Sequence, residues 1–85
     1  MAYRLEVSPR ARRDLRRVPT RAQERLRDHI DALAHMPRPR GVVKLAGEMD
    51  TYRIRVGDYR VLYEVHDRVL LVIVLKVADR KEAYR

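Results

Sequence analysis

Cysteine is absent from the 85-residue sequence, which excludes disulfides, thiolate metal sites and a cysteine nucleophile. No apolar run reaches the roughly 18 residues of a membrane span, and the first residues have none of the long apolar core of a secretory signal. Glycine is scarce, and each glycine falls at an expected turn and not in a phosphate-binding loop: Gly41, Gly47 and Gly57. These absences predict a soluble domain of the cytoplasm.

The length predicts one domain that covers residues 1–85. A chain of this size buries only roughly 60–65% of the surface that its unfolded form exposes, so it builds a single modest core. Apolar residues make up 46% of the sequence, a share that is ordinary for a globular protein and too high for a disordered one.

Positive charge dominates the composition. Twenty basic residues stand against twelve acidic ones, which gives a net charge of +8. Such a surface attracts polyanions, so nucleic acid or an acidic protein is the expected class of partner. All but three of the basic residues are arginine, which suits phosphate recognition and equally suits the codon usage of a GC-rich genome.

The first half of the chain has a strand followed by two helices. Apolar residues alternate over residues 3–7, which predicts a half-buried strand. Ser8 and Pro9 then form a helix start, and helical spacing continues to Pro19. Thr20, with Gln23 three residues later, predicts a capping box for a second helix that runs to about residue 35. Residues 36–41 contain two prolines and form a stiff linker.

The second half changes to the period of β-structure. Apolar residues alternate over residues 52–56 and 59–65, with a turn between them, and residues 69–77 are almost wholly apolar, as in a strand covered on both faces. The expected fold is α+β with the order β-α-α-β-β-β. Two antiparallel helices pack on one face of a small, mostly antiparallel sheet.

Most of the positive charge lies in the expected helices. Residues 1–41 hold eleven basic and five acidic residues, whereas residues 42–85 hold nine and seven. Exposed helix faces are commonly charged, so residues 10–27 indicate a solvated or generally electrostatic surface. The three histidines lack the spacing of metal ligands, and no metal site is expected: His29, His35 and His66.

The expected sheet carries fewer charges than the helices, but several of its basic residues fall on one face. Alternation places Arg53 and Arg55 on one face, and pairing around the turn at residues 57–58 brings Arg60 beside Arg55. Like charges this close are destabilising unless an anion lies between them, which favours a phosphate site. The alternative is that these arginines form salt bridges with the nearby acidic residues, which are Glu48, Asp50 and Glu64.

The end of the chain adds Arg80 and Tyr84 directly after the last strand. Their position predicts that both lie at one end of the sheet, where neighbouring positive charge favours the phenolate form of a tyrosine. The alternative is a frayed polar tail.

Several stretches of the sequence resemble one family of small toxins. They are residues 2–9, 37–39, 44–47, 52–64 and 79–85. The most specific are 44–47, 79–85 and the central stretch 52–64 (Tyr-Arg-Ile-Arg-Val-Gly-Asp-Tyr-Arg-Val-Leu-Tyr-Glu), which is a strong signal. Over nearly its full length the chain resembles the RelE-like toxins of the RelE/ParE superfamily, the toxin components of bacterial toxin–antitoxin modules. The family supplies the same α+β fold.

The resemblance implies an endoribonuclease that cleaves mRNA in the A site of the 30S subunit of the ribosome, without a metal or another cofactor. The 2′-hydroxyl attacks the adjacent phosphate and leaves a 2′,3′-cyclic phosphate and a 5′-hydroxyl. Basic and tyrosine side chains stabilise the phosphorane and move the protons. By position, the resemblance implies catalytic roles for Arg60, Arg80 and Tyr84, and phosphate binding by Arg53, Arg55, Lys44 and Lys81.

Two other functions remain open. The chain resembles the ParE-like toxins as well, which inhibit DNA gyrase and do not cleave RNA. It is also compatible with a toxin homologue that acts mainly in a repressor complex. In each case the expected partner is a cognate antitoxin protein, and DNA operator binding is expected only for the complex with that antitoxin.

Overall fold

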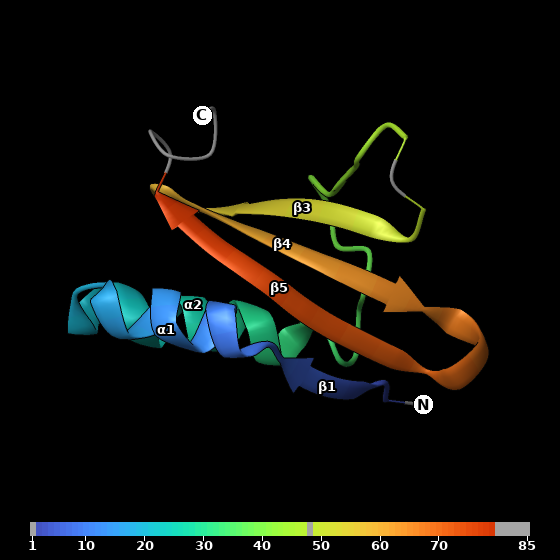
Figure 1. Cartoon of the computed structure of the whole chain (residues 1–85), viewed down its shortest axis with the longest axis horizontal. Helices are drawn as coiled ribbons and strands as arrows, with labels where there is room; N and C mark the ends of the chain where they lie inside the picture. Colours follow the sequence, from blue (N-terminus) through green and yellow to red (C-terminus); the bar gives the residue numbers. More distant parts are fainter. Residues whose placement is uncertain (1, 48, 80–85) are drawn as a thin grey trace.

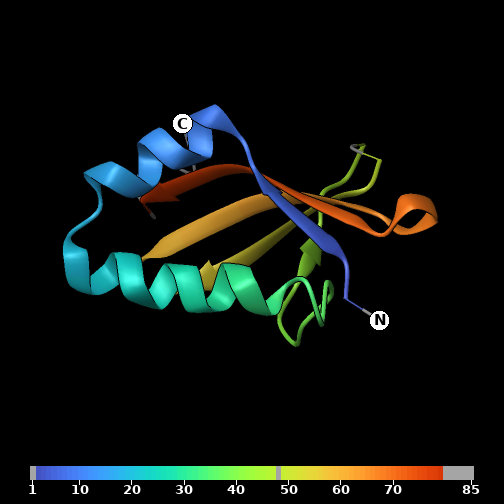
Figure 2. The same cartoon turned by 90° about the horizontal axis from the view of Figure 1, so that it is seen from below.

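The computed structural model describes residues 2–47 and 49–79. Two helices lie on one face of a five-stranded sheet with the order β1-β5-β4-β3-β2 (Figures 1 and 2). β1 is parallel to β5, and the other neighbouring pairs are antiparallel. The elements follow the chain as β1 (Arg4–Val7), α1 (Pro9–Arg17), α2 (Thr20–Ala32), β2 (Val43–Lys44), β3 (Thr51–Val56), β4 (Tyr59–His66), the 3-10 helix η1 (Asp67–Val69) and β5 (Leu71–Asp79).

The start of α1 is confirmed, and α2 begins at Thr20 as expected but without the expected capping box. Ser8 caps α1 because its Oγ accepts a hydrogen bond from the Ala11 backbone N–H at 3.1 Å. Thr20 does not form a capping box. It is already the first residue of α2, the cap position falls on Pro19, and the Gln23 side chain donates to the Val18 carbonyl at 2.8 Å.

The second helix is shorter than its apolar pattern indicates. It ends at Ala32, and the next residues form hydrogen bonds to the third residue back, such as His35 N–H to the Ala32 carbonyl at 3.1 Å. These bonds tighten the end of a helix into a 3-10 turn. The turn keeps Leu33 fully buried although it lies outside the helix.

The meander β3–β4–β5 is confirmed, with two differences. The last strand begins at Leu71 because residues 67–69 form η1 and Leu70 takes a left-handed φ of 51°. The short edge strand β2 was not expected, since two residues are too few to show an alternating pattern.

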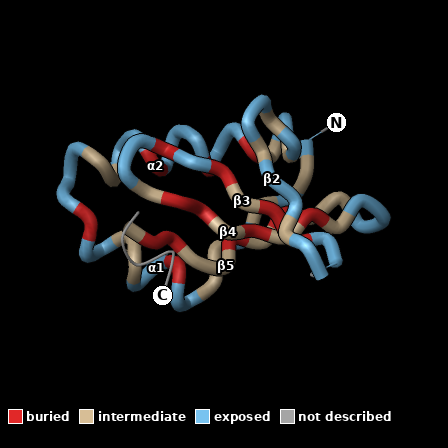
Figure 3. Tube along the Cα trace, turned by 90° about the horizontal axis from the view of Figure 1, so that it is seen from above, coloured by how far each residue is buried: buried red, intermediate tan, exposed pale blue. Residues whose placement is uncertain are grey.

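The core lies between the helices and one face of the sheet, as the burial map shows (Figure 3). Leu26, Ile30 and Leu33 meet Tyr63 and Val74 there, and all five are at most 3% exposed. The expectation that the last strand is covered on both faces is wrong. Both helices lie on one face, and the opposite-face residues Leu71 and Ile73 are only half-buried. The apolar run reflects the place of β5 between β1 and β4.

Candidate functional site

The β3–β4 hairpin decides which side chains reach the face of the sheet that the helices leave uncovered, here called the open face. Gly57 makes the tight turn possible with a φ of 58°, a left-handed conformation that glycine adopts without steric cost. Val56 pairs with Tyr59 next to that turn, and Ile54 pairs with Val61. Because Ile54 and Val61 are core residues, their neighbours along each strand point to the open face.

Four basic side chains share one end of the open face. Arg55 lies directly opposite Arg60, and Arg53 lies opposite Leu62. Leu62 in turn pairs with Lys76 of β5. Residues that are paired across an antiparallel ladder lie on the same face, so the register brings together Arg53, Arg55, Arg60 and Lys76.

Lys76 is the member of this group that the sequence analysis missed. It lies within the apolar run of β5, which indicated a strand buried on both sides and gave no reason to assign it to the basic face. The β4–β5 ladder has a register irregularity between Leu62 and Tyr63. Only the paired register shows that Lys76 falls opposite Leu62.

The basic residues differ in burial. Arg60 is 7% exposed, Arg53 is half-buried and Arg55 is exposed, with its Nε donating to the Gly57 carbonyl at 3.3 Å. A guanidinium held by its surroundings is preorganised to receive an anion, whereas an exposed one remains adjustable. The site therefore combines one largely buried cation, Arg60, with more accessible ones beside it.

The salt-bridge alternative for these arginines does not hold for two of the three acidic residues. The Glu64 carboxylate lies 2.8 Å from His66 Nε2, and the Asp50 carboxylate lies 3.9 Å from His66 Nδ1. Among residues 2–47 and 49–79, no ion pair involves Arg53 or Arg55. Glu48 lies outside the described residues.

The other candidate residues divide into two groups. Lys44 pairs with Tyr52, whose side chain is in the core, so the register places Lys44 on the helix side of the sheet and apart from the four basic residues. Arg80, Lys81 and Tyr84 lie outside the described residues. The described chain ends at Asp79, which pairs with Tyr59 beside the hairpin turn, at the same end as Arg55 and Arg60.

A second polar cluster, unnoticed in the sequence, joins the linker to the sheet. Arg38 donates two hydrogen bonds to the Asp67 carboxylate, at 2.7 and 3.2 Å, and a third to the Tyr52 hydroxyl at 3.1 Å. The Tyr3 hydroxyl also donates to Asp67, at 2.6 Å. These four residues form the Arg38 cluster, which fixes the proline-containing linker onto the sheet. Sequence separations of 14 to 64 residues hide such contacts from pattern analysis.

The Arg38 cluster shifts the ionisation of its members. Hydrogen bonds from Arg38 and then from Tyr3 lower the pKa of Asp67 to about 2. The hydrogen bond to Asp67 raises the pKa of Tyr3, and burial raises the pKa of the neighbouring Tyr63 to about 12. Tyr3 and Tyr63 are therefore unsuited to act as general bases near neutral pH.

The described part of the chain contains no group of three or more His, Asp or Glu side chains that could hold a metal ion. No helix within residues 2–47 and 49–79 is long and apolar enough to cross a membrane.

Known proteins share this fold and about a third of its sequence. The archaeal RelE-RelB complex from Pyrococcus horikoshii contains a chain that matches with a TM-score of 0.84 and 34% identity, over 94% of this chain and 97% of that one. The RelBE2 complex of Mycobacterium tuberculosis matches with a TM-score of 0.82 and 30% identity, over 94% and 100%. The mRNA interferase toxin RelE of Escherichia coli is 31% identical over 98% of this chain and 88% of its own length.

These likenesses define the fold as that of the RelE-like toxins, as the sequence indicated. Residues 5–84 match the family described as the ParE toxin of type II toxin-antitoxin systems, parDE. The chain belongs to this family, within the RelE/ParE superfamily of toxins.

Proposed function

We propose that this chain is a ribosome-dependent endoribonuclease that cleaves mRNA in the A site and is neutralised by a cognate antitoxin. The observation that carries the proposal is the gathering of Arg53, Arg55, Arg60 and Lys76 at the end of the open face where β5 leads into residue 80. The name of the Escherichia coli relative, an mRNA interferase, supports the reaction class. The RelE-RelB complexes support an antitoxin partner.

The chemistry follows from where charge develops. The 2′-hydroxyl oxygen forms a bond to the adjacent phosphorus, and the bond from phosphorus to the 5′-oxygen breaks. A base takes the 2′-hydroxyl proton, and the departing 5′-oxygen takes a proton from solvent water. The phosphorane carries more negative charge than the starting diester, so fixed guanidinium groups stabilise it preferentially.

In this scheme Arg60 stabilises the phosphorane, and Arg53, Arg55 and Lys76 bind the flanking phosphates. Arg80 binds the reacting phosphate and favours departure of the 5′-oxygen, and Tyr84 takes the 2′-hydroxyl proton. Lys81 adds phosphate contact. The raised pKa values of Tyr3 and Tyr63 favour Tyr84 over those two tyrosines as the base.

The test is cleavage of a translated mRNA by the purified chain. We expect cuts at codon spacing that leave 2′,3′-cyclic phosphates, and Arg60→Ala and Arg80→Ala variants slower by about 10²-fold. The matched control is Arg27→Ala, which removes the same charge from an exposed position on α2 and keeps the wild-type rate. If Arg60→Ala does not fold, the cleavage rate of Arg55→Ala, a substitution at an exposed position, tests the basic group instead.

Intact translated mRNA at a large excess of toxin over ribosomes contradicts the proposal. The family match to the ParE toxin favours one alternative, a toxin that inhibits DNA gyrase. Inhibition of gyrase supercoiling by the same preparation, with uncut RNA, assigns that function instead.

A further inference from the structure

The outer edge of β5 is covered in two different ways. From Leu71 to Val74 its neighbour is the parallel strand β1. Beyond Val74, within the described residues, β1 has ended and α1 lies along β5 instead (Figure 2). In place of a neighbouring strand, two side chains of this region form hydrogen bonds with backbone groups of β5. Ser8 Oγ donates to the Leu75 carbonyl at 2.9 Å, and Asp14 Oδ2 accepts from the Val77 N–H at 3.0 Å.

Asp14 makes the later of these two contacts and is unusual within its helix. Five of the nine residues of α1 are arginines, and Asp14 is its one acidic residue. Its side chain is 18% exposed, and the nearest ion-pair contact, to Arg10 Nε, is 3.9 Å long. Aspartate in a helix interior is mildly unfavourable, whereas a carboxylate that accepts from a backbone N–H forms a strong, charge-assisted bond. The contact with Val77 gives this aspartate a tertiary role.

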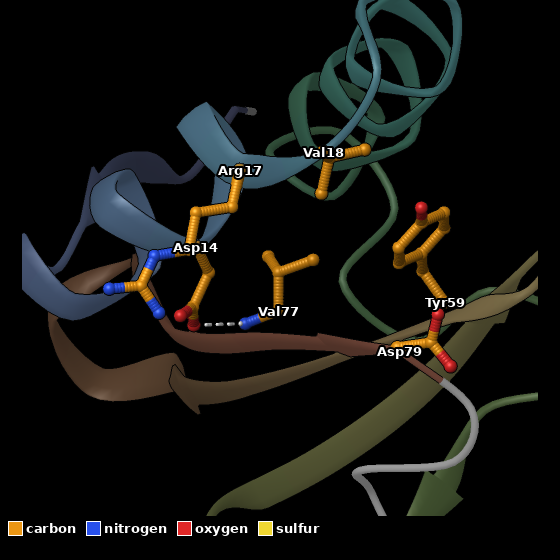
Figure 4. Close-up of a pocket in the computed structure, with 6 residues that line it drawn as sticks. All are labelled: Asp14, Arg17, Val18, Tyr59, Val77 and Asp79. Atoms are coloured by element: carbon orange, nitrogen blue, oxygen red, sulfur yellow. Dashed lines mark hydrogen bonds between the residues drawn. The ribbon is translucent and has the colours of Figure 1, made fainter.

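A cavity separates the end of α1 from the last residues of β5. It has a volume of about 190 Å³ and is lined by Asp14, Arg17, Val18, Tyr59, Val77 and Asp79 (Figure 4). The Asp14–Val77 hydrogen bond lies in its wall. Because the cavity reduces side-chain packing between α1 and this part of β5, the hydrogen bond carries more of the positioning than it does in a close-packed interface.

We propose that Asp14 is a positioning residue for RNA cleavage. β4 pairs with the inner edge of β5 as far as Asp79. By holding the Val77 N–H, Asp14 anchors the outer edge of the same segment, from which the chain continues, three residues later, to Arg80. The inference rests on the proposed function, because Arg80 acts in that reaction. Misplacement of a catalytic group by about 1 Å lowers a rate by up to about 10²-fold, so loss of one backbone contact is enough to matter.

The test compares three variants in the translated-mRNA assay, with kcat and the KM for ribosomes measured separately. Asp14→Ala removes the acceptor, and we expect kcat to fall about tenfold with an unchanged KM. Asp14→Asn keeps an acceptor oxygen without the charge, and we expect a loss of about threefold. Ser8→Ala removes the earlier contact with β5 and the cap of α1, so it lowers stability but keeps kcat within about twofold.

The charge control is Asp28→Ala, an exposed position on α2, which keeps the wild-type kcat. A folded Asp14→Ala protein with the wild-type kcat overturns the inference, and so does Ser8→Ala losing as much kcat as Asp14→Ala. If Asp14→Ala does not fold, Asp14→Asn decides, and the wild-type kcat in that variant contradicts the inference. Failure of the proposed function is distinguishable, because then the wild-type chain itself leaves translated mRNA intact.

Discussion

A single exposed carboxylate, Asp67, joins three segments that are far apart in the sequence. It accepts from Arg38 of the linker and from Tyr3, which precedes β1, while it begins the turn after β4. Arg38 also lies over the Tyr52 ring, 5.0 Å from its centroid, and such a cation–π contact adds to the hydrogen bonds. The Tyr63 hydroxyl donates to the Pro37 carbonyl at 2.7 Å. The linker is thus held at two neighbouring points.

The ionisation of Asp67 predicts an acid-sensitive contribution to stability. Its folded pKa of about 2 lies below the ordinary value of 3.8, because Arg38 and Tyr3 donate to the ionised form. A depressed folded pKa contributes stability that is complete above the unfolded pKa and is lost as pH falls through the folded value. We therefore expect the melting temperature of the wild type to exceed that of Asp67→Asn at neutral pH. The difference should shrink between about pH 4 and pH 2.

Thermal unfolding followed by circular dichroism at a series of pH values measures this difference. The control is Asp58→Asn, which removes a charge from the exposed hairpin turn. A constant difference between wild type and Asp67→Asn from pH 7 to pH 2 contradicts the assignment.

At the scale of elements, the two helices begin in different ways although their first residues look alike. Ser8 satisfies two partners at once, the Ala11 N–H of its own helix and the Leu75 carbonyl of β5. Thr20 makes no side-chain cap, since Pro19 occupies the cap position and Gln23 turns back to Val18. The start of α1 is therefore tied to the sheet, whereas α2 depends on its buried face, from which Leu26 and Ile30 enter the core.

This difference predicts unequal effects of two similar substitutions. Ser8→Ala should lower the free energy of unfolding by about 1–2 kcal/mol, since it removes a helix cap and a bond to the sheet. Thr20→Ala should change it by less than about 0.5 kcal/mol, as expected for an exposed residue without a structural contact. Urea unfolding measures both. Ser8→Thr keeps the hydroxyl and is the control; a loss for Thr20→Ala as large as that for Ser8→Ala would show that the capping box forms after all.

At the scale of the whole molecule, positive charge is most abundant on the helices, whereas it is most regularly arranged on the open face of the sheet. The helices hold many exposed arginines, such as Arg12, Arg16 and Arg27. The open face holds fewer basic residues, but the strand register fixes their relative positions. An array with strand positions that are set by the register can match the spacing of successive phosphates, whereas arginines spread over the helix surfaces provide general attraction. The net charge of +8 therefore describes general attraction to polyanions better than it describes the site.

The open face predicts a measurable salt dependence of RNA binding. If its four basic residues each neutralise one phosphate of a single strand, the affinity should fall about 50-fold between 50 and 200 mM salt. Removing one contact by Arg55→Ala should reduce the slope of log K against log salt by about 0.7. Fluorescence anisotropy with a short single-stranded RNA measures both slopes. An affinity that does not change with salt contradicts phosphate contact as the main source of binding.

The sequence by itself determined the fold class, the meander and the sharing of one face by Arg53, Arg55 and Arg60. Strand alternation has a period of two, and the two-residue turn at Gly57 sets the register of the hairpin, so a local pattern was enough. The same local logic identified Ser8 as a cap. It failed at Thr20, because the preceding proline moves the cap position by one residue.

Only the tertiary structure decided the contacts between distant segments. Lys76 joins the basic group through a register that includes an irregularity. Lys44 does not belong to the basic group, because it pairs with the core residue Tyr52 and so lies on the helix side of the sheet. The Arg38 cluster and the Asp14–Val77 bond connect residues 14 to 64 positions apart. No periodicity encodes such pairs, since they exist only once the helices and the sheet have packed and their remaining hydrogen-bonding groups must find partners.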